Sequence, residues 1–147
     1  MNEICDLHGG VIRNASGDQY FLTFSGVEGV FLAVEKLCAL WKKMIERYQL
    51  GLSIGIHKGD LNFIRSYLFS NDIHTTIFLE RLNSLTYPNK ETISVVATGT
   101  VKESALNTKW ANNFREVDST SITNERLQSI INEHDAYWFI PNDDASQ

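Results

Sequence analysis

Cysteine, proline and long apolar runs are all scarce in this sequence. Its 147 residues include two cysteines and two prolines. Two thiols, Cys5 and Cys38, are too few for a disulfide framework, and the N-terminal residues lack the pattern of a secretory signal. No apolar run approaches the roughly 20 residues that a helix needs to cross a bilayer. These absences predict a cytoplasmic protein with no membrane-spanning segment.

Basic residues are also in deficit. The chain has 13 lysines and arginines against 18 aspartates and glutamates, a formal net charge of -5. A nucleic-acid-binding domain usually carries a basic face, so this balance argues against a nucleic-acid partner. Hydrophobic residues make up 43% of the chain, which is enough for a folded core. The length fits one domain over residues 1–141, and we expect the polar residues 142–147 to form a disordered tail.

Segments that favour strands alternate with segments that favour helices. Residues 11–24 predict a β-hairpin with Gly17-Asp18 at its tip, because Gly and Asp tolerate the backbone angles of tight turns. Apolar residues at three- and four-residue spacing predict a long helix over 27–48. Further strands are expected at 52–57, 92–97, 114–117 and 136–140, and further helices at 72–85 and 100–106. Two segments are ambiguous: residues 61–69 could form a strand or a loop, and residues 124–132 could form a helix or a loop. This order predicts an α+β fold with an antiparallel-rich sheet and helices on one face.

Three sequence blocks then stand in an informative order. They are residues 9–24 (GGVIRNASGDQYFLTF), 52–61 (LSIGIHKGDL) and 67–76 (YLFSNDIHTT), followed by a strand-like segment at 93–96. Together they resemble the catalytic domain of class III nucleotidyl cyclases, the adenylate and guanylate cyclases, over roughly residues 8–105. The resemblance implies a ferredoxin-like palm and the formation of a cyclic mononucleotide from a nucleoside triphosphate.

The resemblance also implies a site. The family uses two divalent cations, Mg²⁺ or Mn²⁺, because such ions neutralise the triphosphate and activate the attacking 3′-hydroxyl. On this match Asp18 is a metal ligand at the hairpin tip. Asn14 falls where the family has a base-contacting lysine, Tyr67 falls where the base is selected, and Asp72 is assigned to nucleotide binding with them. Taken alone, the Gly-Asp pair also fits an ordinary turn in which Asp18 serves only the backbone.

The match departs from the family at several catalytic positions. Seven residues precede His8, so we expect the strand and helix that carry the family's first metal aspartate to be missing. His74 occupies the position of the family's ribose-orienting asparagine, and Phe78 occupies that of its phosphate-binding arginine. Arg81 could replace this arginine only if the alignment is shifted by one helical turn. A phenylalanine cannot replace a bidentate arginine clamp on phosphate. His74 and Arg81 are therefore the catalytic candidates of a domain whose cyclase activity we expect to be impaired or lost in this form.

Two alternatives are left open. The first is a non-catalytic module that binds a nucleotide or serves as a dimerisation surface. The second is a related protein that makes another product. A tyrosine at position 67 would narrow the base pocket, a feature similar to the pyrimidine cyclases of anti-phage signalling. Residues 13–20 also resemble the hairpin of diguanylate cyclases and of CRISPR polymerase palms. In either case the loss of a central strand exposes sheet edges, so we expect a homodimer or a partner chain.

Overall fold

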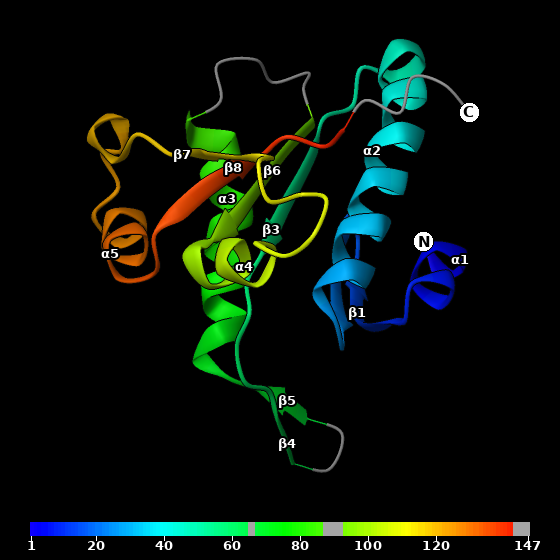
Figure 1. Cartoon of the computed structure of the whole chain (residues 1–147), viewed down its shortest axis with the longest axis horizontal. Helices are drawn as coiled ribbons and strands as arrows, with labels where there is room; N and C mark the ends of the chain where they lie inside the picture. The colour runs from blue at the N-terminus through cyan, green and yellow to red at the C-terminus, as the bar shows by residue number, and fades with distance from the viewer. Residues whose placement is uncertain (65–66, 87–92, 143–147) are drawn as a thin grey trace.

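The computed structural model describes residues 1–64, 67–86 and 93–142 of the chain. Its helices are α1 (Asn2–Leu7), α2 (Val27–Tyr48), α3 (Asn71–Thr86), α4 (Gly99–Ser104) and α5 (Glu125–His134), with a 3-10 turn at Ser119–Ser121 (Figure 1). Its strands are β1 (Gly10–Ser16), β2 (Gln19–Phe24), β3 (Leu52–Ile56), β4 (Asn62–Ile64), β5 (Tyr67–Phe69), β6 (Ile93–Thr98), β7 (Phe114–Glu116) and β8 (Ala136–Phe139).

A four-stranded sheet in the order β3-β6-β8-β7 forms the centre of the fold. β3 runs parallel to β6, and β8 is antiparallel to both of its neighbours, so the sheet is mixed. The last five residues of β6 are all buried. Valine and threonine favour extended backbone, and a strand buried along its whole length belongs in a sheet that is packed on both sides.

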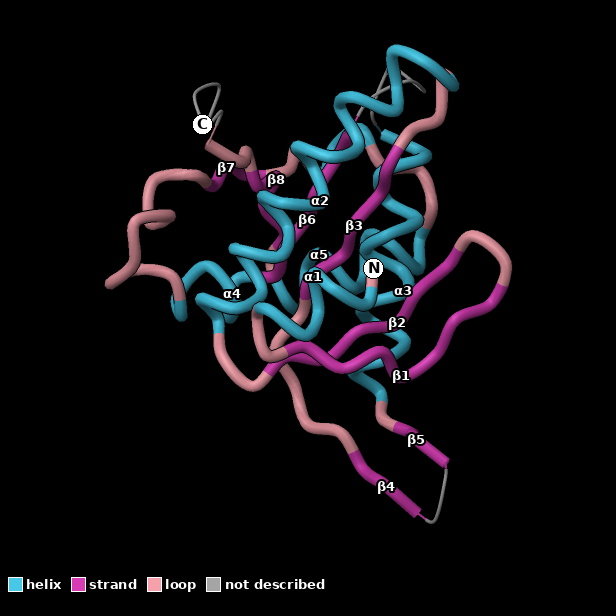
Figure 2. The backbone as a smooth tube through the Cα atoms, turned by 90° about the vertical axis from the view of Figure 1, so that its right-hand side faces the viewer, coloured by secondary structure: helices cyan, strands magenta, loops and turns pink. Residues whose placement is uncertain are grey.

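Helices accordingly cover both faces of this sheet, with α2 on one side and α3 and α5 on the other (Figures 1 and 2). Val95 and Ala97 of β6 pack in one cluster with Phe31 of α2. Val96 lies between them in sequence and so faces the opposite side, where it packs with Leu79 of α3 and the apolar residues of α5. The expected α+β class is confirmed. The structure differs from the expectation in having helices on two faces rather than one, because alternate residues of β6 need cover on opposite sides.

Most of the expected elements are present. The hairpin, the long helix α2, and the strands and helices expected at 52–57, 72–85, 92–97, 100–106, 114–117 and 136–140 all form, within a few residues of the expected bounds. The two ambiguous segments become the β4–β5 hairpin and α5, while α1 was not expected. Of the expected tail, residues 143–147 lie outside the described residues. Among the residues described, no helix combines the length and the apolar character needed to span a membrane.

The β1–β2 hairpin is separate from the central sheet. Within the described ranges β2 pairs only with β1 and β3 pairs only with β6, so each strand has one edge without a neighbouring strand. The hairpin is instead held by α1 and α2. Gly29 of α2 passes so close to the carbonyl oxygen of His8 that a Cβ atom there would clash, which explains a glycine in a position where it otherwise weakens a helix.

Candidate functional site

Asp18 lies at the exposed tip of the β1–β2 hairpin. Gly17, just before it, has a φ of 60°, a conformation that glycine adopts without strain. Asn14 lies on β1 opposite Phe21, beside an irregularity in the strand register, and its side chain is exposed like that of Asp18. The hairpin therefore presents the expected metal ligand and one expected base contact together.

Glu80 in the middle of α3 is a second carboxyl that the hairpin tip influences. Burial raises the pKa of the half-buried Glu80 carboxyl, the positive charge of Arg81 lowers it, and the negative charge of Asp18 raises it further. The effect of Asp18 is the smallest of the three, so it does not by itself bring the two carboxyls into one site.

The Asp18 carboxylate limits the metal chemistry that the hairpin tip can support. A Mg²⁺-like cation can be bound by one or two carboxylates when phosphate oxygens and water supply its other ligands. The described part of the chain contains no group of three or more His, Cys, Asp or Glu side chains that could enclose a metal ion. The exposed Asp18 therefore fits a single hard cation whose other ligands would be phosphate oxygens and water.

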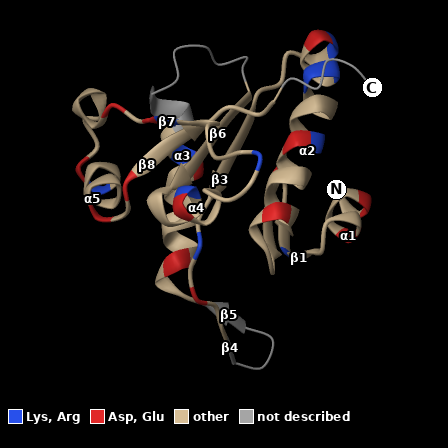
Figure 3. Cartoon of the chain, viewed as in Figure 1, with Lys and Arg blue, Asp and Glu red and all other residues tan. Residues whose placement is uncertain are grey.

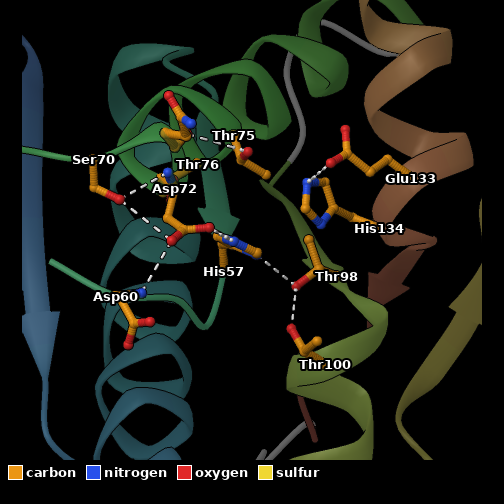
Figure 4. Close-up of polar contacts among 11 residues, drawn as sticks. His57, Asp60, Ser70, Asp72, Thr75, Thr76, Thr98, Thr100, Glu133 and His134 are labelled. Atoms are coloured by element: carbon orange, nitrogen blue, oxygen red, sulfur yellow. Dashed lines mark hydrogen bonds and ion pairs between the residues drawn. The ribbon is translucent and has the colours of Figure 1, made fainter.

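A polar network fixes the start of α3 (Figure 4). The His57 side chain is 3% exposed and the Asp72 side chain 31%. Because a carboxylate only accepts, Nε2 of His57 donates to Oδ1 of Asp72 over 2.7 Å. On the other side of the ring, Nδ1 of His57 lies 3.0 Å from Oγ1 of Thr98, which lies 3.1 Å from Oγ1 of Thr100. These contacts join the end of β3, the start of α3 and the junction of β6 with α4.

The other oxygen of Asp72 is also in use. Oδ2 accepts from the backbone N–H of Asp60 at 3.0 Å and from the hydroxyl of Ser70 at 3.3 Å. The hydrogen bond from His57 lowers the pKa of the Asp72 carboxyl, burial opposes that effect, and the Asp60 N–H lowers it further. Both oxygens of Asp72 hold the protein's own groups, so the geometry supports a structural role, and its part in nucleotide binding stays a prediction.

His74, the first catalytic candidate, lines a hollow of about 270 Å³ between α3 and α5. Phe78, one turn further along α3, forms part of its wall. The guanidinium of Arg126 from α5 lies over the Phe78 ring, 4.3 Å from its centroid, and that of Arg81 lies 5.6 Å from the same centroid. The second catalytic candidate, Arg81, is therefore near the hollow through this shared aromatic neighbour.

The structure divides the expected site residues into two groups. Asn14 and Asp18 lie on the hairpin, and neither is among the residues that line the α3–α5 hollow. Asp72, His74 and Arg81 lie along α3, and Tyr67 begins β5, the strand just before it. A further charged residue, Arg126 over the Phe78 ring, was not expected, because no local pattern distinguishes it from other charged residues on helix surfaces.

Comparison with known proteins supports the fold. No protein-family model and no curated protein matches the chain. A solved structure, the adenylate/guanylate cyclase/hydrolase from Silicibacter pomeroyi, is similar with a TM-score of 0.58 and 14% sequence identity, over 96% of this chain and 78% of that one. The chain therefore has a cyclase-like fold.

Proposed function

We propose that this chain is a class III nucleotidyl cyclase-like domain that binds a nucleoside triphosphate with one divalent cation, Mg²⁺ or Mn²⁺, and has little or no cyclase activity by itself. The observation that carries the proposal is the cyclase-like fold with Asp18 exposed at the tip of its hairpin. A cation bound to this carboxylate would neutralise part of the triphosphate charge. The chain's own part is to present the carboxylate on a tight turn between two paired strands.

The proposed loss of turnover follows from α3. Stabilising the charge that develops on a phosphoryl group needs donors aimed at its oxygens, and each lost donor costs about 10² to 10³ in rate. The side of α3 that lines the hollow carries the exposed His74 and the half-buried Phe78, and a phenylalanine ring offers no N–H to a phosphate oxygen. In addition, Asn14 and Asp18 do not line the same hollow as His74.

Product formation tests the catalytic half of the proposal. The purified chain is incubated with ATP, GTP, CTP or UTP and Mn²⁺, and cyclic mononucleotides and cyclic dinucleotides are measured by mass spectrometry. We expect no product above the protein-free reaction. Robust formation of a cyclic nucleotide from any of the four would overturn this half, and the base and ring size of the product would then identify a purine, pyrimidine or diguanylate cyclase.

Thermal unfolding tests the binding half. A ligand at 100 times its dissociation constant stabilises the folded state by about 2.7 kcal/mol, so triphosphate with Mn²⁺ is expected to raise the melting temperature. Asp18→Asn should abolish the part of the rise that depends on Mn²⁺, measured against the same nucleotide with EDTA, while Asp6→Asn, which removes the same charge from an exposed site on α1, should preserve it. No shift with any nucleotide would leave the non-catalytic dimerisation module as the better description.

The dimerisation module is supported by one observation, the edges of β2 and β3 that no described strand covers. The proposed partner is a second copy or another protein chain. In Figure 3 acidic and basic positions are interspersed along α2 and α5 instead of forming a basic stripe, which agrees with the proposal that nucleic acid is not the partner.

A further inference from the structure

The hollow between α3 and α5 has a lining of one chemical character. Its residues offer one guanidinium, several hydrogen-bonding groups and a small apolar wall, and none is acidic: Asn71, His74, Thr75, Phe78, Arg126, Ser129 and Ile130. The chain as a whole carries more acidic than basic residues. A hollow without carboxylates in an acidic protein favours an anionic ligand over a cation.

Arg126 is held in place there without a carboxylate partner among the described residues. Its guanidinium lies 4.3 Å from the centroid of the Phe78 ring, a cation–π contact that leaves the N–H groups at the guanidinium edge available. Its backbone is fixed as well, because the Asn124 side chain caps α5 by accepting from the N–H groups of Arg126 and Leu127. A planar set of fixed N–H donors matches the oxygens of a phosphate group.

We propose that this hollow binds the phosphate or diphosphate group of a small molecule, with Arg126 as the main ligand and His74 and Ser129 as further donors. At about 270 Å³ the hollow lies below the range of roughly 300 to 1,000 Å³ typical of drug-sized ligands, so it suits a phosphoryl group better than a whole nucleoside triphosphate. The site needs neither a metal ion nor Asp18, so it can be tested separately from the metal-dependent site. Its lining does include His74 and Phe78, the positions that the cyclase resemblance assigns to ribose and phosphate, while Arg126 is the residue that the resemblance does not assign.

Isothermal titration in the presence of EDTA tests this site, with inorganic pyrophosphate, inorganic phosphate, AMP and uncharged adenosine as probes. We expect at least one phosphorylated probe to bind and adenosine not to bind. Tighter binding of AMP assigns the site to the phosphate of a nucleotide, and tighter binding of pyrophosphate or phosphate assigns it to an inorganic anion. The absence of binding by all three phosphorylated probes overturns the proposal.

Matched variants locate the binding. Arg126→Gln is expected to weaken it by about tenfold or more, since a charge-assisted hydrogen bond is lost. Arg47→Gln is the control, because Arg47 also lies over an aromatic ring, that of Tyr48, but on α2, across the sheet. Equal weakening by both variants would mean that only net charge matters and would refute the site. Asp18→Asn should leave this binding unchanged, which separates it from the metal-dependent nucleotide site.

Discussion

At the scale of single residues, Asp72 ties the start of α3 to the end of β3. Asp72→Ala leaves the 3%-exposed His57 side chain without its charged acceptor and the Asp60 N–H without its partner. We expect the free energy of unfolding in urea to fall by about 2–4 kcal/mol. Asp60→Ala removes the same charge from an exposed side chain while keeping the N–H, so it should change stability by less than about 0.5 kcal/mol. Equal losses in the two variants would show that charge, not the hydrogen bonds, matters.

The same carboxyl makes stability depend on pH. The hydrogen bond from His57 holds the folded-state pKa of Asp72 below its ordinary value of 3.8. A group with a lowered folded-state pKa contributes stability that is present above its unfolded pKa and is lost as the pH falls through the folded value. The stability difference between wild type and Asp72→Asn should therefore shrink between pH 5 and pH 3 in chemical unfolding. A difference that grows on acidification would contradict the assignment.

The sequence allows only some of these residues to be predicted. The turn at Asp18 is predictable because Gly and Asp have local backbone preferences. Arg126 is not, because its role comes from its position over Phe78 on another element. Asp72 is predictable only in part. Its position at the start of a helix follows from the sequence, but its hydrogen bond with His57 does not.

At the scale of elements, β3 and α3 meet without space for a side chain. A Cβ atom at Gly55 would lie 2.7 Å from the carbonyl oxygen of Thr76 and 2.8 Å from the amide nitrogen of Glu80. Gly55→Ala should push α3 off the sheet and lower the unfolding free energy by about 1–3 kcal/mol in urea titration. Gly26→Ala is the control, because Gly26 has an extended φ of -143° and open space around it. A loss with Gly26→Ala as large as that with Gly55→Ala would contradict this explanation.

Elements with a strong internal pattern were predictable, and those defined by pairing were not. The apolar stripe of α2 predicts the observed helix Val27–Tyr48. The β4–β5 hairpin was ambiguous because its three-residue strands are too short to show a period. Whether α5 would form a helix or a loop was also ambiguous, because its buried residues are only Leu127 and Ile131. The sequence did not predict helices on both faces of the sheet. The pattern of a single helix reveals its apolar side but not which face of the sheet that side packs against.

At the scale of the whole molecule, several strands of the described chain have an edge without a neighbouring strand, β2 and β3 among them. β2 and β3 each pair on one side only within the described chain, and unpaired edges promote association. Exposed apolar side chains nearby in sequence, Tyr48 and Leu50, are each 53% exposed and add to that tendency. We expect the chain to sediment as a dimer, or to require a partner chain, at micromolar concentration. A stable monomer at those concentrations would contradict this prediction.

The proposed function requires a divalent cation at the hairpin tip, and NMR can locate it because Mn²⁺ broadens the signals of nuclei near it. With Mn²⁺ and a nucleoside triphosphate present, we expect the strongest broadening at the amides of Gly17 to Gln19, and its loss in Asp18→Asn. Broadening centred on another part of the chain, or broadening at the hairpin that persists in Asp18→Asn, would contradict a cation site at Asp18.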